Sequence, residues 1–164
     1  MMTRKFSLAP FICLSFLWFS GNVTDAQVNI HGCIEGLPSA KVYLAEVYAG
    51  RAKLIDTVTV YHDCFDFHES DTLHEGVYYV ILNPEKTAFV QLIINGKEVA
   101  FHSIYNNLPG NLVIDKSLDN KMLYDYISRT RVLTDNNKPG SEKLADTIIH
   151  QYPHSMLSGI LRAQ

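Results

Sequence analysis

Cys33 and Cys64 are the residues of this chain whose side chains point most directly to a chemistry. An even pair of cysteines in an oxidising compartment is typical of a disulfide. Two unpaired, half-buried thiols are the equal alternative, because the sequence does not give the Cα separation that a bridge requires. Thiol–disulfide exchange usually needs an exposed thiolate with a resolving cysteine close by in the sequence. The wide spacing of this pair therefore favours a structural disulfide or idle thiols over exchange.

A short alternating segment suggests a metal site. Its potential ligands are His62, Cys64, Asp66 and His68. In one unbroken strand these side chains would point to the same face, and alternate strand residues can share a metal ion. However, His62 and Asp63 are also typical of a hairpin turn, which would destroy the common orientation. We therefore expect solvent-facing polar residues here, and no metal or other cofactor.

The chain shows no motif of a hydrolase or of a nucleotide-binding enzyme. It has no Gly-x-Ser-x-Gly turn and no Gly-rich phosphate loop, so we expect no catalytic residues and no enzyme activity. A sugar- or peptide-binding surface is harder to exclude. The tyrosines that would suit one are Tyr43, Tyr48, Tyr61, Tyr78, Tyr79 and Tyr105. Tyrosines on strands are more often half-buried, with the hydroxyl at the rim.

Residues 1–26 predict export through a signal peptide. Two basic residues precede an apolar run over 6–19, and a small-residue site would allow cleavage between Ala26 and Gln27. The run is too short to span a bilayer as a permanent helix. Cys13 lies inside this run without the lead-in that lipoprotein processing needs, so a lipid anchor is not expected. We expect a periplasmic or cell-envelope protein with no membrane span after signal removal.

Composition limits the partners. The chain has 14 Lys and Arg against 17 Asp and Glu, a net charge of −3. The basic residues are scattered and form no run, so nucleic acid is not an expected partner. An unknown protein or a cell-envelope ligand remains as the expected partner.

The elements that must position these residues are mostly strands. From residue 28 the apolar residues recur with period two, and turn residues separate about seven short segments. This pattern predicts an antiparallel meander that folds into a β-sandwich over residues 27–110. The run over 77–82 suits a central strand, and Asn95 with Gly96 is the strongest hairpin signal.

The periodicity changes after Pro109 and Gly110. Apolar residues between 118 and 127 follow a helical stripe, which Ser117 or Asp119 could cap. Ser141 begins a second expected helix, and Pro153 suits the first residue of a third. We therefore predict a segment of two or three helices over 111–164.

Several short motifs follow one another in a fixed order between residues 28 and 127. They are Gly32 and Gly36, Val42-Tyr43-Leu44, Asp56-Thr57, Phe65-x-Phe67, Gly76-x-Tyr78 and Asn120. In this order they resemble the DUF4369 domain of Bacteroidetes exported proteins. That domain usually precedes a helical linker and a thioredoxin-like domain in thiol-disulfide oxidoreductases similar to TlpA and ResA.

The resemblance implies an N-terminal accessory domain whose own function is not established. The helices from Ser117 onward look like the start of the linker, whereas the thioredoxin-like domain and its Cys-x-x-Cys are missing. The expected function is therefore a non-catalytic exported β-sandwich module of unknown ligand. The alternatives are thiol–disulfide exchange through Cys33 and Cys64, and metal binding through the segment from His62 to His68.

Overall fold

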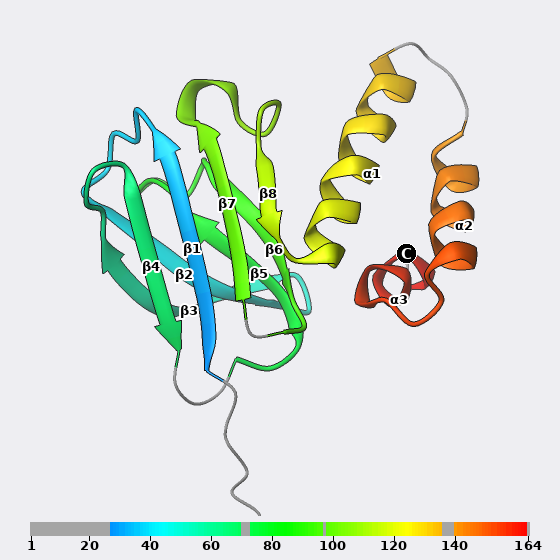
Figure 1. Ribbon diagram of the computed structural model, residues 1–164, viewed down its shortest axis with the longest axis horizontal. Helices are drawn as coiled ribbons and strands as arrows, with labels where there is room; N and C mark the ends of the chain where they lie inside the picture. The colour runs from blue at the N-terminus through cyan, green and yellow to red at the C-terminus, as the bar shows by residue number, and fades with distance from the viewer. Residues whose placement is uncertain (1–26, 70–72, 97, 136–139, 164) are drawn as a thin grey trace, which may run out of the picture.

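The computed structural model describes residues 27–69, 73–96, 98–135 and 140–163 (Figure 1). The predicted signal peptide, with its cleavage site after Ala26 and with Cys13, lies outside these residues. Within them the chain forms eight strands and then three α-helices, which confirms the mainly-β prediction. The strands are β1 (Val28–Glu35), β2 (Lys41–Tyr48), β3 (Arg51–Thr59), β4 (Cys64–Glu69), β5 (Gly76–Ile81), β6 (Phe89–Ile94), β7 (Glu98–Ile104) and β8 (Val113–Lys116).

The strands form two four-stranded sheets that pack face to face. The first sheet has the order β4-β1-β7-β8, and the second has the order β3-β2-β5-β6. All pairs are antiparallel except β1 with β7, which run parallel. The core between the sheets includes the fully buried side chains Ile30, Phe67, Leu44, Tyr78 and Phe101. The period-two pattern therefore directs one face of each strand into this core and the other face outward.

Two turn predictions had opposite outcomes. His62 and Asp63 have φ angles of 46° and 63°, and Tyr61 and Cys64 exchange backbone hydrogen bonds around them. This confirms the predicted turn but not a hairpin of two paired strands, because β3 and β4 belong to different sheets and the turn closes only the single bridge between Tyr61 and Cys64. The predicted hairpin at Asn95 and Gly96 was wrong. β6 and β7 belong to different sheets, so this connection crosses the sandwich.

The last strand was not predicted. β8 lies beyond residue 110, in the segment expected to be helical, and its four residues are too few to show a periodicity. It pairs with β7 and forms one edge of the first sheet.

The helices are α1 (Leu118–Asp135), α2 (Ser141–Gln151) and α3 (Met156–Arg162), and they lie to one side of the sandwich (Figure 1). They share a second core with one outward-facing residue of β6. Its buried members are Ile93, Leu123, Ile148, Leu157 and Leu161. None of these helices is long and apolar enough to span a bilayer.

Side chains of α1 bind the open edge of β6. The Asn120 amide accepts from Ile93 N and donates to Ile93 O, both at 2.7 Å. The Tyr124 hydroxyl accepts from Gln91 N at 3.1 Å and donates to Gln91 O at 2.9 Å. Because strand residues two apart present their backbone groups to the same side, one turn of α1 takes the place of a neighbouring strand.

Candidate functional site

The outer face of the first sheet carries the disulfide. Cys33 on β1 and Cys64 on β4 are direct partners across the strand pair, with a Cα–Cα separation of 4.0 Å, and a disulfide joins them. Cys64 exchanges its backbone hydrogen bonds with Tyr61 and not with β1. In antiparallel sheets, a pair without hydrogen bonds between its two residues brings the side chains closest, so this position suits a bridge. Both cysteines are half-buried.

A histidine and an aspartate stand beside the bridge. His31 Nε2 lies 3.4 Å from Cys33 Sγ, and His31 Nδ1 lies 2.6 Å from Asp66 Oδ1. Because the Asp66 carboxylate accepts a hydrogen bond from Nδ1, the second ring nitrogen is left facing the sulfur. Half of each of these two side chains is exposed, 49% for His31 and 48% for Asp66. The four groups therefore form a continuous series, Asp66–His31–Cys33–Cys64, across β1 and β4.

A second histidine–aspartate pair lies on the other side of Cys33. His102 of β7 is the register partner of Cys33, and its Nδ1 is 2.9 Å from Asp115 Oδ2 of β8. The bridge is therefore flanked by imidazoles on its own strand and on the neighbouring strand, each oriented by a carboxylate.

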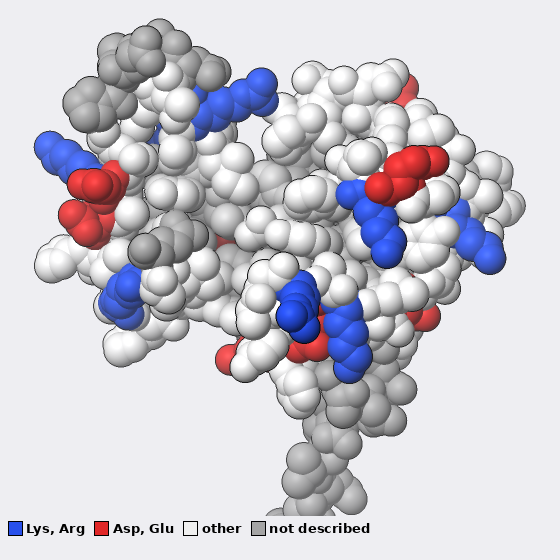
Figure 2. Space-filling view, turned by 180° about the vertical axis from the view of Figure 1, so that it is seen from behind, with Lys and Arg blue, Asp and Glu red and all other residues white. Residues whose placement is uncertain are grey.

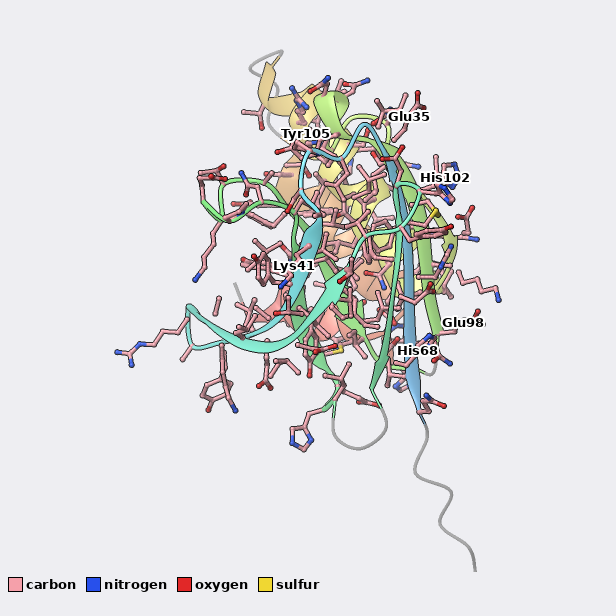
Figure 3. The ribbon with its side chains drawn as sticks, turned by 90° about the vertical axis from the view of Figure 1, so that its left-hand side faces the viewer. Glu35, Lys41, His68, Glu98, His102 and Tyr105 are labelled. Carbon is pink, nitrogen blue, oxygen red and sulfur yellow. A yellow bond between two sulfur atoms is a disulfide. The ribbon has the colours of Figure 1, made fainter. Side chains whose placement is uncertain are left out.

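The rest of this face is polar as well. His68 Nδ1 of β4 lies 2.8 Å from Asn29 Oδ1 of β1, and Lys116 of β8 pairs with Glu98 of β7. Figure 3 shows His68, Glu98 and His102 along the same side of the sandwich, away from the second sheet.

The structure separates the residues of the metal hypothesis. His62 lies in the turn, so only Cys64, Asp66 and His68 alternate along β4. Cys64 is joined to Cys33 by the disulfide. Asp66 is hydrogen-bonded to His31, and His68 is hydrogen-bonded to Asn29. Among the residues that the structure describes, no three His, Cys, Asp or Glu side chains are grouped to hold a metal ion. The metal hypothesis therefore gains no support here.

The six tyrosines do not form one surface. Tyr78 is in the core, where its hydroxyl donates to His74 O and burial raises its pKa. Tyr48 and Tyr61 are the most exposed of the six, at 79% and 74%. Tyr105 belongs to a short 3-10 helix after β7, and only Tyr43 and Tyr79 share a face.

That shared face is the outer face of the second sheet, which holds a shallow cavity of about 250 Å³. Residues that line it include Tyr43, Ala45, Leu54, Ile81, Pro84 and Lys86. Phe89 is the register partner of Ile81, and its ring contacts that of Tyr79 with centroids 4.5 Å apart and the ring planes tilted by 31°. Leu54 and Phe89 are 57% and 45% exposed. Figure 2 views the molecule from behind, where broad uncharged areas separate a few charged side chains.

The sequence reasoning missed His31 and the partnership of Asp66. A signal for both was present, because a disulfide between antiparallel strands fixes their register. If Cys33 faces Cys64, the residue two positions before Cys33 must face the residue two positions after Cys64, and these are His31 and Asp66. No such signal exists for His102 on β7 or Asp115 on β8, because no motif in the sequence fixes the register of β7 against β1 or β8.

Comparison with protein-family models, with curated proteins and with solved structures finds no match for this chain.

Proposed function

We propose that this chain is an exported, non-catalytic β-sandwich module that binds a sugar-containing ligand of the cell envelope. The site is the shallow cavity on the outer face of the second sheet, between β3, β2 and β5. The observation that carries the proposal is the set of apolar and aromatic side chains on this face, of which Leu54 and Phe89 are exposed and Tyr43 and Tyr79 are half-buried. Exposed apolar surface gathered around a concavity is typical of a ligand site.

The chemistry of the cavity favours a sugar over a purely apolar ligand. Aromatic rings can stack on the apolar face of a pyranose, and Tyr79 and Phe89 form a ring pair next to the cavity. Lys86 lines the rim and supplies hydrogen-bond donors to sugar hydroxyls. Leu54, on the edge strand β3, adds an exposed apolar side chain to the lining.

Export is supported by the disulfide as well as by the predicted signal. Disulfides persist in oxidising compartments such as the periplasm. The bridge between Cys33 and Cys64 fits that location, and it fixes β1 to the edge strand β4.

The resemblance to DUF4369 domains stays a prediction. Three of the motif residues have definite structural roles in this fold. Gly32 leaves room for two phenylalanine rings, Gly36 has a φ of 73°, and Asn120 is fully buried against β6.

The binding proposal is tested by amide chemical-shift titration with soluble oligomers of N-acetylglucosamine. We expect shifts that cluster at Tyr43, Leu54 and Ile81. Leu54→Ser should weaken binding about tenfold, which corresponds to about 1.4 kcal/mol. The matched control is Leu118→Ser, because Leu118 is similarly exposed, at 63%, but lies on α1. Absence of shifts, or equal affinity in both variants, would contradict the proposal.

A further inference from the structure

We propose that the Cys33–Cys64 disulfide is exchangeable, and that it oxidises a pair of thiols on a protein partner. His31 stabilises the Cys33 sulfur as it leaves, and Asp66 positions His31. The exchange is stoichiometric and not catalytic, because each chain transfers one disulfide and ends with two thiols. It is separate from the proposed sugar binding, because it uses the outer face of the opposite sheet.

The geometry around the bridge is that of an activated leaving group. A thiolate leaves a disulfide faster when positive charge or a hydrogen-bond donor stabilises it. His31 Nε2 is already 3.4 Å from Cys33 Sγ, within hydrogen-bonding range for sulfur. The Asp66 carboxylate at 2.6 Å from Nδ1 holds the ring in place.

The sheet order indicates which sulfur is attacked. An incoming thiolate approaches one sulfur from the side opposite the other, and the two cysteines are register partners on the neighbouring strands β1 and β4. β4 is an edge strand, so the approach to Cys64 Sγ comes from the open side of the sheet. The opposite approach, to Cys33 Sγ, passes over β7 where His102 is the register partner. Cys64 is therefore the attacked residue and Cys33 the leaving one.

The exchange is balanced in two steps. The first thiolate of the partner forms a bond to Cys64 Sγ, the Cys33–Cys64 bond breaks, and its electron pair moves to Cys33 Sγ. The Cys33 thiolate then takes a proton from the His31 imidazolium. The partner's second thiolate then attacks the partner's first sulfur, which is bonded to Cys64 Sγ in the mixed disulfide. This attack releases the Cys64 thiolate, which is protonated by water. The partner leaves with a new disulfide, and this chain keeps two thiols.

Several charged and ionisable side chains share this face. They are His31 and Glu35 of β1, Asp66 and His68 of β4, Glu98 and His102 of β7, and Asp115 and Lys116 of β8. Only His31 has a ring nitrogen within hydrogen-bonding distance of a bridge sulfur among the hydrogen bonds of the described residues. Its imidazole is therefore the group that stabilises the leaving sulfur.

The first test is the rate of reduction of the native protein by dithiothreitol at one fixed pH. We expect His31→Gln to slow reduction about tenfold. Asp66→Asn should slow reduction in the wild-type background but not in the His31→Gln background, a dependence that a merely structural role of Asp66 would not produce. The matched control is His68→Gln, since His68 lies on β4 and bonds Asn29, away from the bridge. Thermal melts of the oxidised variants verify that each one folds.

The second test identifies the attacked sulfur. Brief treatment with glutathione, acid quenching and peptide mass analysis should place the adduct on Cys64. An adduct mainly on Cys33, or reduction rates for His31→Gln equal to those of wild type, would overturn the proposal. Reduction should leave N-acetylglucosamine binding unchanged, so failure of either proposal is visible without the other.

Discussion

Gly32 lies on the inner face of β1, between phenylalanines on both neighbouring strands. Its register partners are Phe65 on β4 and Phe101 on β7. A Cβ at this position would overlap the Phe65 ring and lie 2.8 Å from Phe101 Cζ. The two rings meet edge to face over the glycine, with centroids 6.0 Å apart. The missing side chain is therefore what allows this aromatic pair to fill the core.

Gly32→Ala should lower the free energy of unfolding by about 1–3 kcal/mol, because an added methyl group in a packed core displaces its neighbours. Urea denaturation measures this change. Gly96→Ala is the matched control, since a Cβ at Gly96 meets nothing within 4 Å. Equal stability of the two variants would show that the rings do not close over Gly32.

The buried hydroxyl of Tyr124 should make the free energy of unfolding fall at alkaline pH. Burial raises its pKa above the ordinary value of 10.0, and the backbone bond at Gln91 only partly offsets this. Above about pH 10 the unfolded chain loses this proton while the folded chain keeps it. The unfolded state then binds fewer protons, so stability falls by up to about 1.4 kcal/mol per pH unit.

Urea denaturation at pH 8 and pH 11 should show this loss, and Tyr124→Phe should reduce it. Tyr78, whose pKa burial also raises, contributes to the same trend. Tyr48→Phe is the control, because Tyr48 is 79% exposed. An identical loss of stability in the wild type, in Tyr124→Phe and in Tyr48→Phe would contradict a buried, protonated Tyr124.

At the scale of elements, α1 joins the helices to the sandwich through side chains that imitate a strand. Asn120 and Tyr124 satisfy the backbone of Ile93 and Gln91. The neighbouring residue, Asp119, accepts hydrogen bonds from the Asn95 side chain and from Leu157 N at the start of α3. An open sheet edge invites pairing with other chains, and α1 removes that hazard at β6.

Asn120→Ala should leave two buried backbone groups without partners. We expect the free energy of unfolding to fall by about 2–6 kcal/mol, since each of the two unpaired groups costs about 1–3 kcal/mol. Native-state hydrogen exchange should show a selective loss of protection at the Ile93 amide. Asn106→Ala, at an exposed position, should change neither quantity. Unchanged protection at Ile93 in both variants would mean that α1 does not hold the edge of β6.

At the scale of the whole molecule, local patterns predicted elements and long-range contacts decided their arrangement. The alternation along β1 and the turn at His62 and Asp63 are properties of neighbouring residues, so the sequence was sufficient for both. The parallel pairing of β1 with β7 was out of reach, because it depends on the chain crossing between sheets at Asn95. The site followed the same rule. Both cysteines were recognised, whereas the approach of His31 and Asp66 required the register of β1 against β4.

Both proposals describe an exported sandwich in which Cys33 is bonded to Cys64, and peptide mapping without reductant tests this most directly. The chain is isolated from the cell envelope after its free thiols are blocked, and is then digested and analysed by mass spectrometry. The account predicts one linked peptide pair that contains Cys33 and Cys64 and that separates on reduction. Blocked, unlinked Cys33 and Cys64 in that material would contradict it.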